Sequence, residues 1–237
     1  MVRLAPVERT RSVRPQRGAL LLLLAGFLLL LAAPLAAQGG RTWYARRITT
    51  GDAPLRIEDF WSRGPDLHAE LVFGGHPIVT IVHGERYLTL DRLQMSGVSI
   101  QRSPKAIRQD ANRGRPFGHE LEILLADGGE KVGTEKVSGR RCDLYRVTDA
   151  KGRREVCVSQ DKARLPLLLR VFDRSSGRSV ESRYVEWESG IEIPDSFFAP
   201  DPRYQLEQFS YEDYLKQAAK GPVGPSPALH ADLLHGR

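Results

Sequence analysis

The chain has 237 residues, 27% of them charged, and a formal net charge of +6 at pH 7. Residues 1–37 hold five arginines and one glutamate, so the rest of the chain carries 6 − 4 = +2. This mixed charge gives no reason to expect nucleic acid as a partner, and the length allows one large domain.

The N-terminal segment has the three parts of a secretory signal peptide. A basic stretch is followed by an apolar run over 19–31, and Pro34 with small residues leads to Ala37. This order is typical of exported proteins. We expect residues 1–37 to be cleaved off, and the protein to reach the periplasm by the Sec route, because no paired arginines precede the apolar run. An uncleaved membrane anchor over 19–37 is the alternative.

Short β-rich runs fill the chain from 41 to 102. Many of them alternate apolar and polar residues with a period of two, which predicts strands. Turn residues separate the runs, among them Gly51, Gly64, Gly74 and Gly84. We therefore expect a meander of antiparallel strands.

The periodicity changes after this meander. Ser103 is placed to cap a helix that begins with a proline, and we expect that helix over 104–111. Apolar residues then recur at helical spacing until Gly128. A second short helix is therefore expected over 117–126.

Strands resume over 130–189, and the segment 193–205 has the composition of a closing turn and loop. Ser210 is placed to cap a last helix, and the Pro/Gly-rich segment 221–237 is expected to be a flexible tail. The whole pattern predicts an α+β fold over 41–220: a strongly curved antiparallel sheet of about eleven strands, an incomplete barrel with a helical lid inserted midway. A two-sheet sandwich is the alternative.

No short motif of nucleotide, metal or nucleophile chemistry occurs, such as HExxH, GxSxG, GxGxxG or CxxC. The six histidines are scattered, whereas a zinc site needs close ligand spacing or convergence in the fold. Neighbouring carboxylates on alternating strands are typical of a solvated face. We expect no cofactor, no metal and no enzymatic activity; a secreted hydrolase with carboxylates across a cleft is the weaker interpretation.

Several strands are apolar on both faces, among them 70–73, 77–82 and 165–172. One apolar face packs a core, but two such faces must be covered on both sides. Helices can cover one of them if the sheet wraps round the helices. That geometry leaves either a filled core or an apolar cavity beneath a helical lid.

Cys142 and Cys157 flank a turn at Asp149–Gly152, in an antiparallel hairpin. In an antiparallel pair, the residue numbers of opposed positions have a constant sum. The two cysteines are directly opposed if that sum is 299. If Asp149 pairs with Gly152, the sum is 301 and the cysteines lie one diagonal apart. Both registers put the two sulfurs on one face, and export brings them to an oxidising compartment. We predict a disulfide, worth about 3 kcal/mol for a loop of about 15 residues. The hairpin's other face, expected to be buried, carries Tyr145, Val147, Val156 and Val158.

The order of these elements resembles the bacterial LolA/LolB-like family, periplasmic carriers and receptors of outer-membrane lipoproteins. The unit 81–92 is similar to a recurrent hairpin of the family, and the insertion from Ser103 is similar to its lid. The paired strands over 133–147, the strand over 163–173 and the loop over 193–205 resemble the segments that follow the lid.

The resemblance extends from Arg41 to Gln205. Ala163 and Arg164 stand where relatives tend to have glycine, and Arg203 replaces the glycine expected before the next tyrosine. The segment from 211 onward has no clear match. The resemblance therefore supports the fold better than it supports lipoprotein transport.

Such a fold implies a monomeric binding protein that holds lipid or lipoprotein acyl chains in an apolar cavity between sheet and lid. A sensor or interaction module with an envelope protein as partner is the alternative. Strand parity leaves open which face is concave, so the candidate residues mix cavity lining with outer packing. They are Leu71, Phe73, Val79, Ile81, Leu88 and Leu90 on strands, and Leu121, Leu124 and Leu125 on the lid.

Overall fold

The computed structural model describes residues 41–111 and 114–236, and the expected signal peptide lies outside them. The strands are β1 (Thr42–Gly51), β2 (Arg56–Arg63), β3 (Asp66–Phe73), β4 (His76–His83), β5 (Arg86–Asp91), β6 (Ser96–Gln101), β7 (Glu130–Val137), β8 (Arg140–Asp149), β9 (Gly152–Ser159), β10 (Pro166–Asp173), β11 (Ser179–Ser189) and β12 (Gln205–Phe209). The helices are α2 (Pro104–Asp110), α3 (Glu120–Ala126), α4 (Tyr211–Ala218) and α5 (Ala231–His235), with a 3₁₀ turn η1 (Asp195–Phe198).

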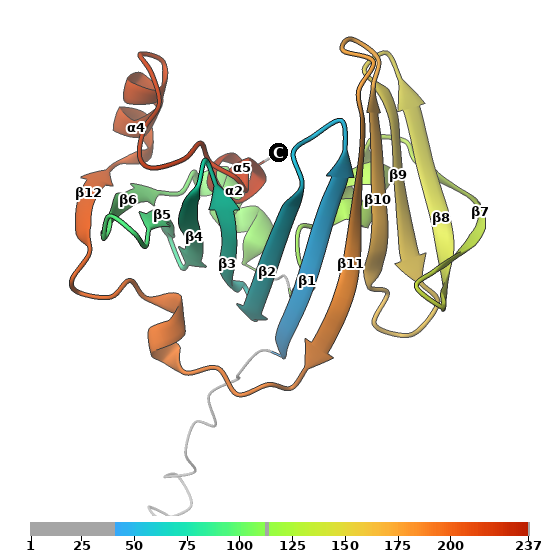
Figure 1. Ribbon diagram of the computed structural model, residues 1–237, viewed down its shortest axis with the longest axis horizontal. Coiled ribbons are helices and arrows are strands. Elements are labelled where there is room, and N and C mark those ends of the chain that lie inside the picture. The colour runs from blue at the N-terminus through green and yellow to red at the C-terminus, as the bar shows by residue number, and fades with distance from the viewer. Residues whose placement is uncertain (1–40, 112–113, 237) are drawn as a thin grey trace, which may run out of the picture. The chain divides into compact units, whose positions relative to one another are not determined.

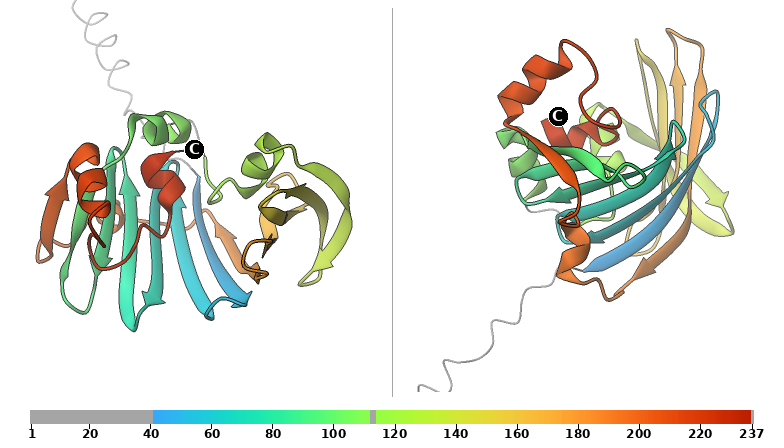
Figure 2. Two further views of the ribbon diagram at one scale, coloured as in Figure 1. Left: turned by 90° about the horizontal axis from the view of Figure 1, so that it is seen from above. Right: turned by 60° about the vertical axis from the view of Figure 1, so that its left-hand side comes forward.

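All twelve strands belong to one sheet, in the order β12-β6-β5-β4-β3-β2-β1-β11-β10-β9-β8-β7. Two antiparallel meanders, β1–β6 and β7–β11, join where β1 pairs with β11, and β12 returns parallel to β6. The sheet curves strongly and stays open (Figures 1 and 2). A register shift at Arg46/Arg47 lies where the meanders meet, and such bulges bend a sheet. The predicted incomplete barrel is confirmed, with one edge strand more than expected.

Helices cover the concave face of this sheet (Figure 2). α2 and α3 come from the insertion midway along the chain, as expected, and α4 and α5 come from the C-terminal segment. Ser103 caps α2 by accepting a hydrogen bond from the Ala106 amide at 3.0 Å, and Ser210 caps α4 in the same way through Asp213. The cover is thus made of two segments that are distant in the sequence.

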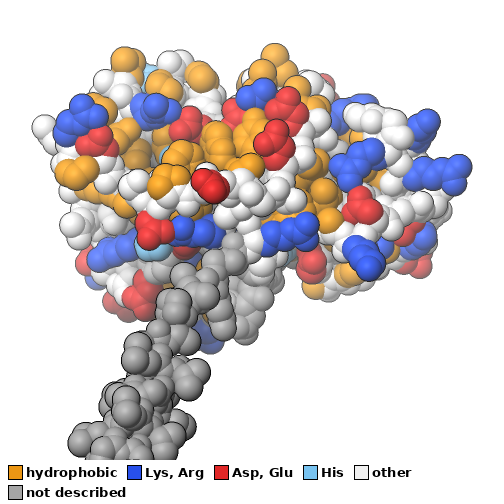
Figure 3. Space-filling view, turned by 90° about the horizontal axis from the view of Figure 1, so that it is seen from below, with side chains coloured by type: hydrophobic (Ala, Val, Ile, Leu, Met, Phe, Trp, Pro, Cys, Tyr) orange, Lys and Arg blue, Asp and Glu red, His pale blue; other side chains and the backbone are white. Residues whose placement is uncertain are grey.

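The convex face is covered too. Buried residues of β4 and β5 pack there with Phe198 of η1 and with the partly buried Ile193 and Tyr204 of the β11–β12 connection. Seen from below, apolar side chains gather in the middle of the molecule, with charged side chains to either side (Figure 3). The double cover explains why strands such as β4 are apolar on both faces.

The C-terminal segment differs from the flexible tail expected of it. Residues 221–236 run back to the concave face and end in α5, where Leu234 is 0% exposed. Gly and Pro dominate the composition of this segment, but Leu233 and Leu234 give its last turn an apolar side to bury. That short signal outweighs the composition.

The disulfide between Cys142 and Cys157 is present, as predicted, with Cα atoms 5.4 Å apart. Asp149 pairs with Gly152, so the register sum is 301 and the cysteines lie one diagonal apart. The directly opposed register is wrong, because the tight turn sets the pairing. On the other face, Val147, Val156 and Val158 are buried against Leu124 of α3.

Candidate functional site

The middle of the concave face is aromatic. Phe60 of β2 and Tyr184 and Trp187 of β11 lie there, and Phe117 of the insertion packs onto them. Ring centroids are 5.1 Å apart for Phe60 and Phe117, and 5.2 Å apart for Phe117 and Trp187. Phe117 has φ 58°, a left-handed backbone that directs this side chain into the sheet at a conformational cost. The insertion therefore fills the concave face with its own aromatic side chain.

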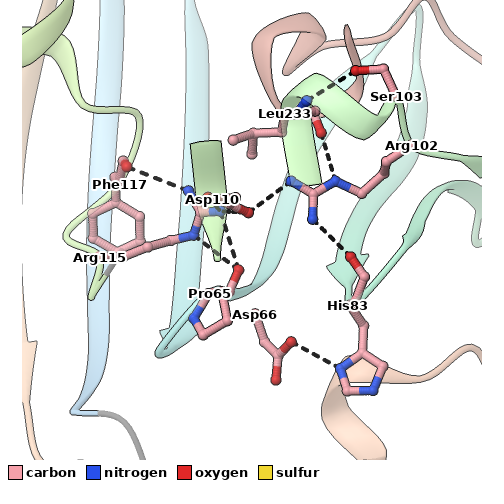
Figure 4. Close-up of polar contacts among 11 residues, drawn as sticks. Pro65, Asp66, His83, Arg102, Ser103, Asp110, Arg115, Phe117 and Leu233 are labelled. Atoms are coloured by element: carbon pink, nitrogen blue, oxygen red, sulfur yellow. Dashed lines mark hydrogen bonds and ion pairs between the residues drawn. The ribbon is translucent and has the colours of Figure 1, made fainter. Parts of the chain in front are cut away.

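A buried ion triad fastens the helical cover to the sheet (Figure 4). Asp110 of α2 accepts from Arg102 at 2.8 Å and from Arg115 at 2.6 Å. Arg102 also donates to the carbonyl of Leu233 in α5, at 2.7 Å, and to that of Gly84 in the β4–β5 turn, at 2.8 Å. Through Arg102, Asp110 thus links the insertion and the C-terminal helix to the β4–β5 turn at one end of the strands.

A second polar cluster lies under the cover, on the concave face itself. Arg47 of β1 forms an ion pair of 2.5 Å with Glu58 of β2. The Nε2 atom of His230, just before α5, lies 3.0 Å from the other carboxylate oxygen of Glu58. Close by, the Tyr184 hydroxyl donates to Oε1 of Glu120 at 2.8 Å. The cluster joins both covering segments to the sheet.

The environment of this cluster changes its pKa values. Burial opposes ionisation of Glu58, but Arg47 and His230 outweigh it and lower the pKa to about 2. Burial raises the pKa of Glu120, and the charge of Arg47 counteracts this rise only in part. Burial and the Glu120 carboxylate together raise the pKa of Tyr184 well above its usual value. The charges of Arg47 and Glu58 therefore balance each other in a site withdrawn from water.

A hollow of about 290 Å³ opens beside this cluster, between the α3 segment and the β9–β10 connection. Its lining is half polar and half apolar: Gly114, Pro116, His119, Glu120, Leu121, Glu122, Val158, Ala163, Arg164 and Pro166. Ligand pockets for small molecules span roughly 300–1,000 Å³. The hollow is therefore just below that range.

The structure separates the predicted ligand-binding residues into groups. Leu71 lies on the concave parity of β3, and Phe73 is partly exposed at the end of that strand. Leu124 packs onto the sheet, Leu121 lines the hollow, and Leu125 is exposed. The remaining four, Val79, Ile81, Leu88 and Leu90, lie on the convex face beneath η1. The predicted residues thus lie on both faces of the sheet and on the cover.

Three polar atoms on the concave face were not anticipated from the sequence. Nε of Arg47, Oγ of Ser62 and Nε1 of Trp187 are buried and have no hydrogen-bond partner among the described residues. They come from three adjacent strands, β1, β2 and β11, around Ala45 and Phe60. The sequence does carry a signal for such atoms, because charged and polar residues stand at those alternate positions of β1 and β2 whose other members are apolar. An unpaired buried polar atom costs about 1–3 kcal/mol.

Between 41 and 236, in the described part of the chain, no group of three or more His, Cys, Asp or Glu side chains is placed to hold a metal ion. None of the helices described there is long and apolar enough to cross a membrane.

Comparison with known proteins finds a shared fold. No protein-family model and no curated protein matches the chain. Among solved structures, an uncharacterised conserved protein from Thermus thermophilus aligns with a TM-score of 0.52 at 9% identity, over 71% of this chain and 91% of that one. At this identity the likeness shows the fold alone.

Two further structures are more distant. The MucA/MucB complex of Pseudomonas aeruginosa aligns with a TM-score of 0.44 at 14% identity, over 70% of this chain and 58% of that one. A putative outer membrane lipoprotein-sorting protein domain from Vibrio parahaemolyticus aligns with a TM-score of 0.32 at 13% identity, over 68% and 89%. These two alignments, at such identities and TM-scores, carry no inference about the activity of this chain.

Proposed function

We propose that this is an exported, non-enzymatic binding protein that holds acyl chains of a lipid or lipoprotein between the concave face and the helical cover. The observation that carries the proposal is the construction of the cover. Phe117, Leu233 and Leu234 bury the apolar concave face, but their segments contribute no strand there. Separation of the cover would therefore expose an apolar face and leave the sheet paired.

Acyl chains are suited to such a face. Each Å² of apolar surface removed from water contributes about 25 cal/mol, so a chain that replaces Leu234 and Phe117 restores the burial that opening removes. The unpaired Arg47 Nε and Trp187 Nε1 groups are hydrogen-bond donors at the centre of this face. The ester or amide carbonyl that joins an acyl chain to its headgroup would supply the acceptor they lack.

Two features support the exported location. The signal-peptide pattern of residues 1–37 is typical of secretion. The disulfide between Cys142 and Cys157 is a bond that persists in oxidising compartments such as the periplasm. Lipids and acylated proteins of the cell envelope are the ligands within reach there.

A pair of matched substitutions tests the proposal. Leu234→Ala removes a fully buried side chain (0% exposed) from the cover, and Leu90→Ala removes one (2% exposed) from the convex face. Both should destabilise the fold by about 2–5 kcal/mol. Only Leu234→Ala makes room on the concave face, so it should bind a fluorescent long-chain fatty acid more tightly, and Leu90→Ala should bind it like the wild type.

Native mass spectrometry of protein from its own envelope supplies the second readout, and should show co-purified lipid. No lipid and no fatty-acid binding would overturn the proposal. An equal gain in fatty-acid binding by Leu234→Ala and Leu90→Ala would mean that the fatty acid binds to any destabilised form of the protein and not to the concave face. One stoichiometric protein partner without lipid would favour the sensor or interaction module.

A further inference from the structure

A row of alternating charges crosses four strands on the convex face. Arg146 of β8, Glu155 of β9, Arg170 of β10 and Glu181 of β11 are register partners from strand to strand. Glu155 accepts from Arg146 at 2.7 Å and from Arg170 at 3.3 Å, and Arg170 donates to Glu181 at 3.0 Å. Each charged side chain in this row therefore has an oppositely charged neighbour within the row.

The next row toward the hairpin turns has no acid. It consists of Thr148, Arg153, Phe172 and Ser179. Arg153 is 55% exposed in its side chain, and its ion pair, of 3.6 Å, is with Glu155, which two closer arginines already share. Beside it the Phe172 ring is 36% exposed. A guanidinium without a carboxylate of its own thus lies next to an aromatic surface.

Two hollows meet at these residues. One, of about 430 Å³, is lined by Arg146, Thr148, Gly152, Arg153, Phe172 and Arg174. The other, of about 180 Å³, shares Arg153 and Phe172 and extends to Val171 and Val180; it is also lined by Arg170 and Glu181, which form an ion pair with each other. Three of the six residues that line the larger hollow are arginines, and none is acidic. An anionic group is the ligand chemistry that this lining favours.

The hairpin turns add charge of the same sign. The β1–β2, β8–β9 and β10–β11 turns lie at one end of the sheet, the upper end in Figure 1. Lys151, Arg174 and Arg178 project from the last two turns. The acids of the three turns, Asp52, Asp149 and Asp173, each accept backbone N–H groups that shape the turns. With Arg153, four basic groups lie at this end beside three acids that already have partners. Arg154 is not among them, because it forms ion pairs with Asp127 and Asp149.

Exposed apolar side chains accompany this charge. Leu55 before β2 is 69% exposed, and Ile57 and Val171 are also exposed at this end. A free phosphate ion would leave these side chains in water, whereas a lipid surface offers headgroup phosphates and an apolar boundary together. Basic and apolar groups at one end therefore indicate a membrane surface.

We propose that the end of the sheet formed by these three hairpin turns docks on an anionic lipid surface, with a headgroup phosphate in the hollow between Arg153 and Arg174 beside Phe172. The docking surface lies at the turns and on the convex face, apart from the concave face proposed for acyl chains. It gives the protein a place on the membrane that does not depend on a bound acyl chain.

Co-sedimentation with vesicles tests this. Vesicles of phosphatidylcholine with phosphatidylglycerol should bind the full chain, and vesicles of phosphatidylcholine alone should bind it much less. Arg153→Gln/Arg174→Gln should weaken partition into the anionic vesicles about 30-fold, since each cation near the surface contributes about 1 kcal/mol. Phe172→Ser should weaken it severalfold. Arg141→Gln, on β8 at the far end of the sheet, is the matched control and should bind like the wild type.

All variants share the same N-terminal segment, so differences in vesicle binding among them report on the sheet alone. Equal thermal melting of Arg141→Gln and the double variant excludes unfolding as the cause of a difference. Equal vesicle binding by these two variants would overturn the proposal. So would full competition by millimolar inorganic phosphate, which would mark a free-anion site, or binding to an acidic peptide without binding to anionic vesicles. The fatty-acid assay with Leu234→Ala is read separately, so either proposal can fail alone.

Discussion

Glu58 is a carboxylate whose charge is built into the concave face. Its pKa is lowered from 4.5 to about 2 by Arg47 and His230, against the opposing effect of burial. A carboxyl with a depressed folded-state pKa stabilises the fold above its unfolded pKa. That contribution is lost as pH falls through the folded value. The window of loss therefore runs from about pH 4.5 down to about pH 2.

Glu58→Gln removes this contribution and leaves the Arg47 guanidinium buried without its counter-charge. We expect the free energy of unfolding at pH 7 to fall by about 3 kcal/mol. The difference from wild type should shrink between pH 5 and pH 2.5, as the wild type loses its advantage. Urea unfolding at several pH values measures it. Glu188→Gln, at an exposed position of β11, is the control with no such difference; a gap independent of pH would contradict the assignment.

At the scale of the secondary-structure elements, the disulfide between Cys142 and Cys157 stabilises the hairpin of β8 and β9. Replacing both cysteines by serine opens a loop whose closure is worth about 3 kcal/mol in the chain-entropy model. Serine also brings hydroxyl groups to two fully buried positions, which adds to the loss. The urea midpoint should fall, and the slope should rise slightly, because the unfolded chain without the cross-link is less compact and exposes more surface. Free-thiol labelling of folded, non-reduced wild-type protein would contradict the bond.

These elements show how far the sequence leads. The strand meanders, the insertion and the disulfide follow from period, turn chemistry and compartment, because each depends on residues close in the chain. Of the two registers that the sequence leaves open, the structure has the one set by the Asp149–Gly152 turn. The sequence shows that Arg47 and Glu58 are charged residues at strand positions where the alternation is otherwise apolar. Their pairing with His230, however, depends on a C-terminal segment whose composition resembles a tail. Such partners are fixed only by the tertiary fold.

On the scale of the whole described chain, the molecule consists of a paired sheet and a cover, and Asp110 is one of the buried carboxylates that attach the cover. Because this carboxylate holds Arg102 and Arg115, and Arg102 holds the backbone of α5, Asp110→Asn should remove the counter-charge that these two buried guanidinium groups share. Breaking a buried pair in this way costs about 3–5 kcal/mol. We expect amide hydrogen exchange to speed up in α2 and α5, while β1 to β5 keep their protection, since strand pairing does not pass through the cover.

Asp201→Asn is the control, because it disturbs an ion pair with Arg203 that lies at the surface, where such pairs contribute about 0–1 kcal/mol. A uniform gain in exchange over cover and sheet would show that the two unfold as one unit, and would contradict an opening of the cover alone. Selective exchange, combined with tighter fatty-acid binding by Asp110→Asn, would connect release of the triad to access to the concave face. The buried triad would then act as the fastening that keeps the apolar face closed in the absence of ligand.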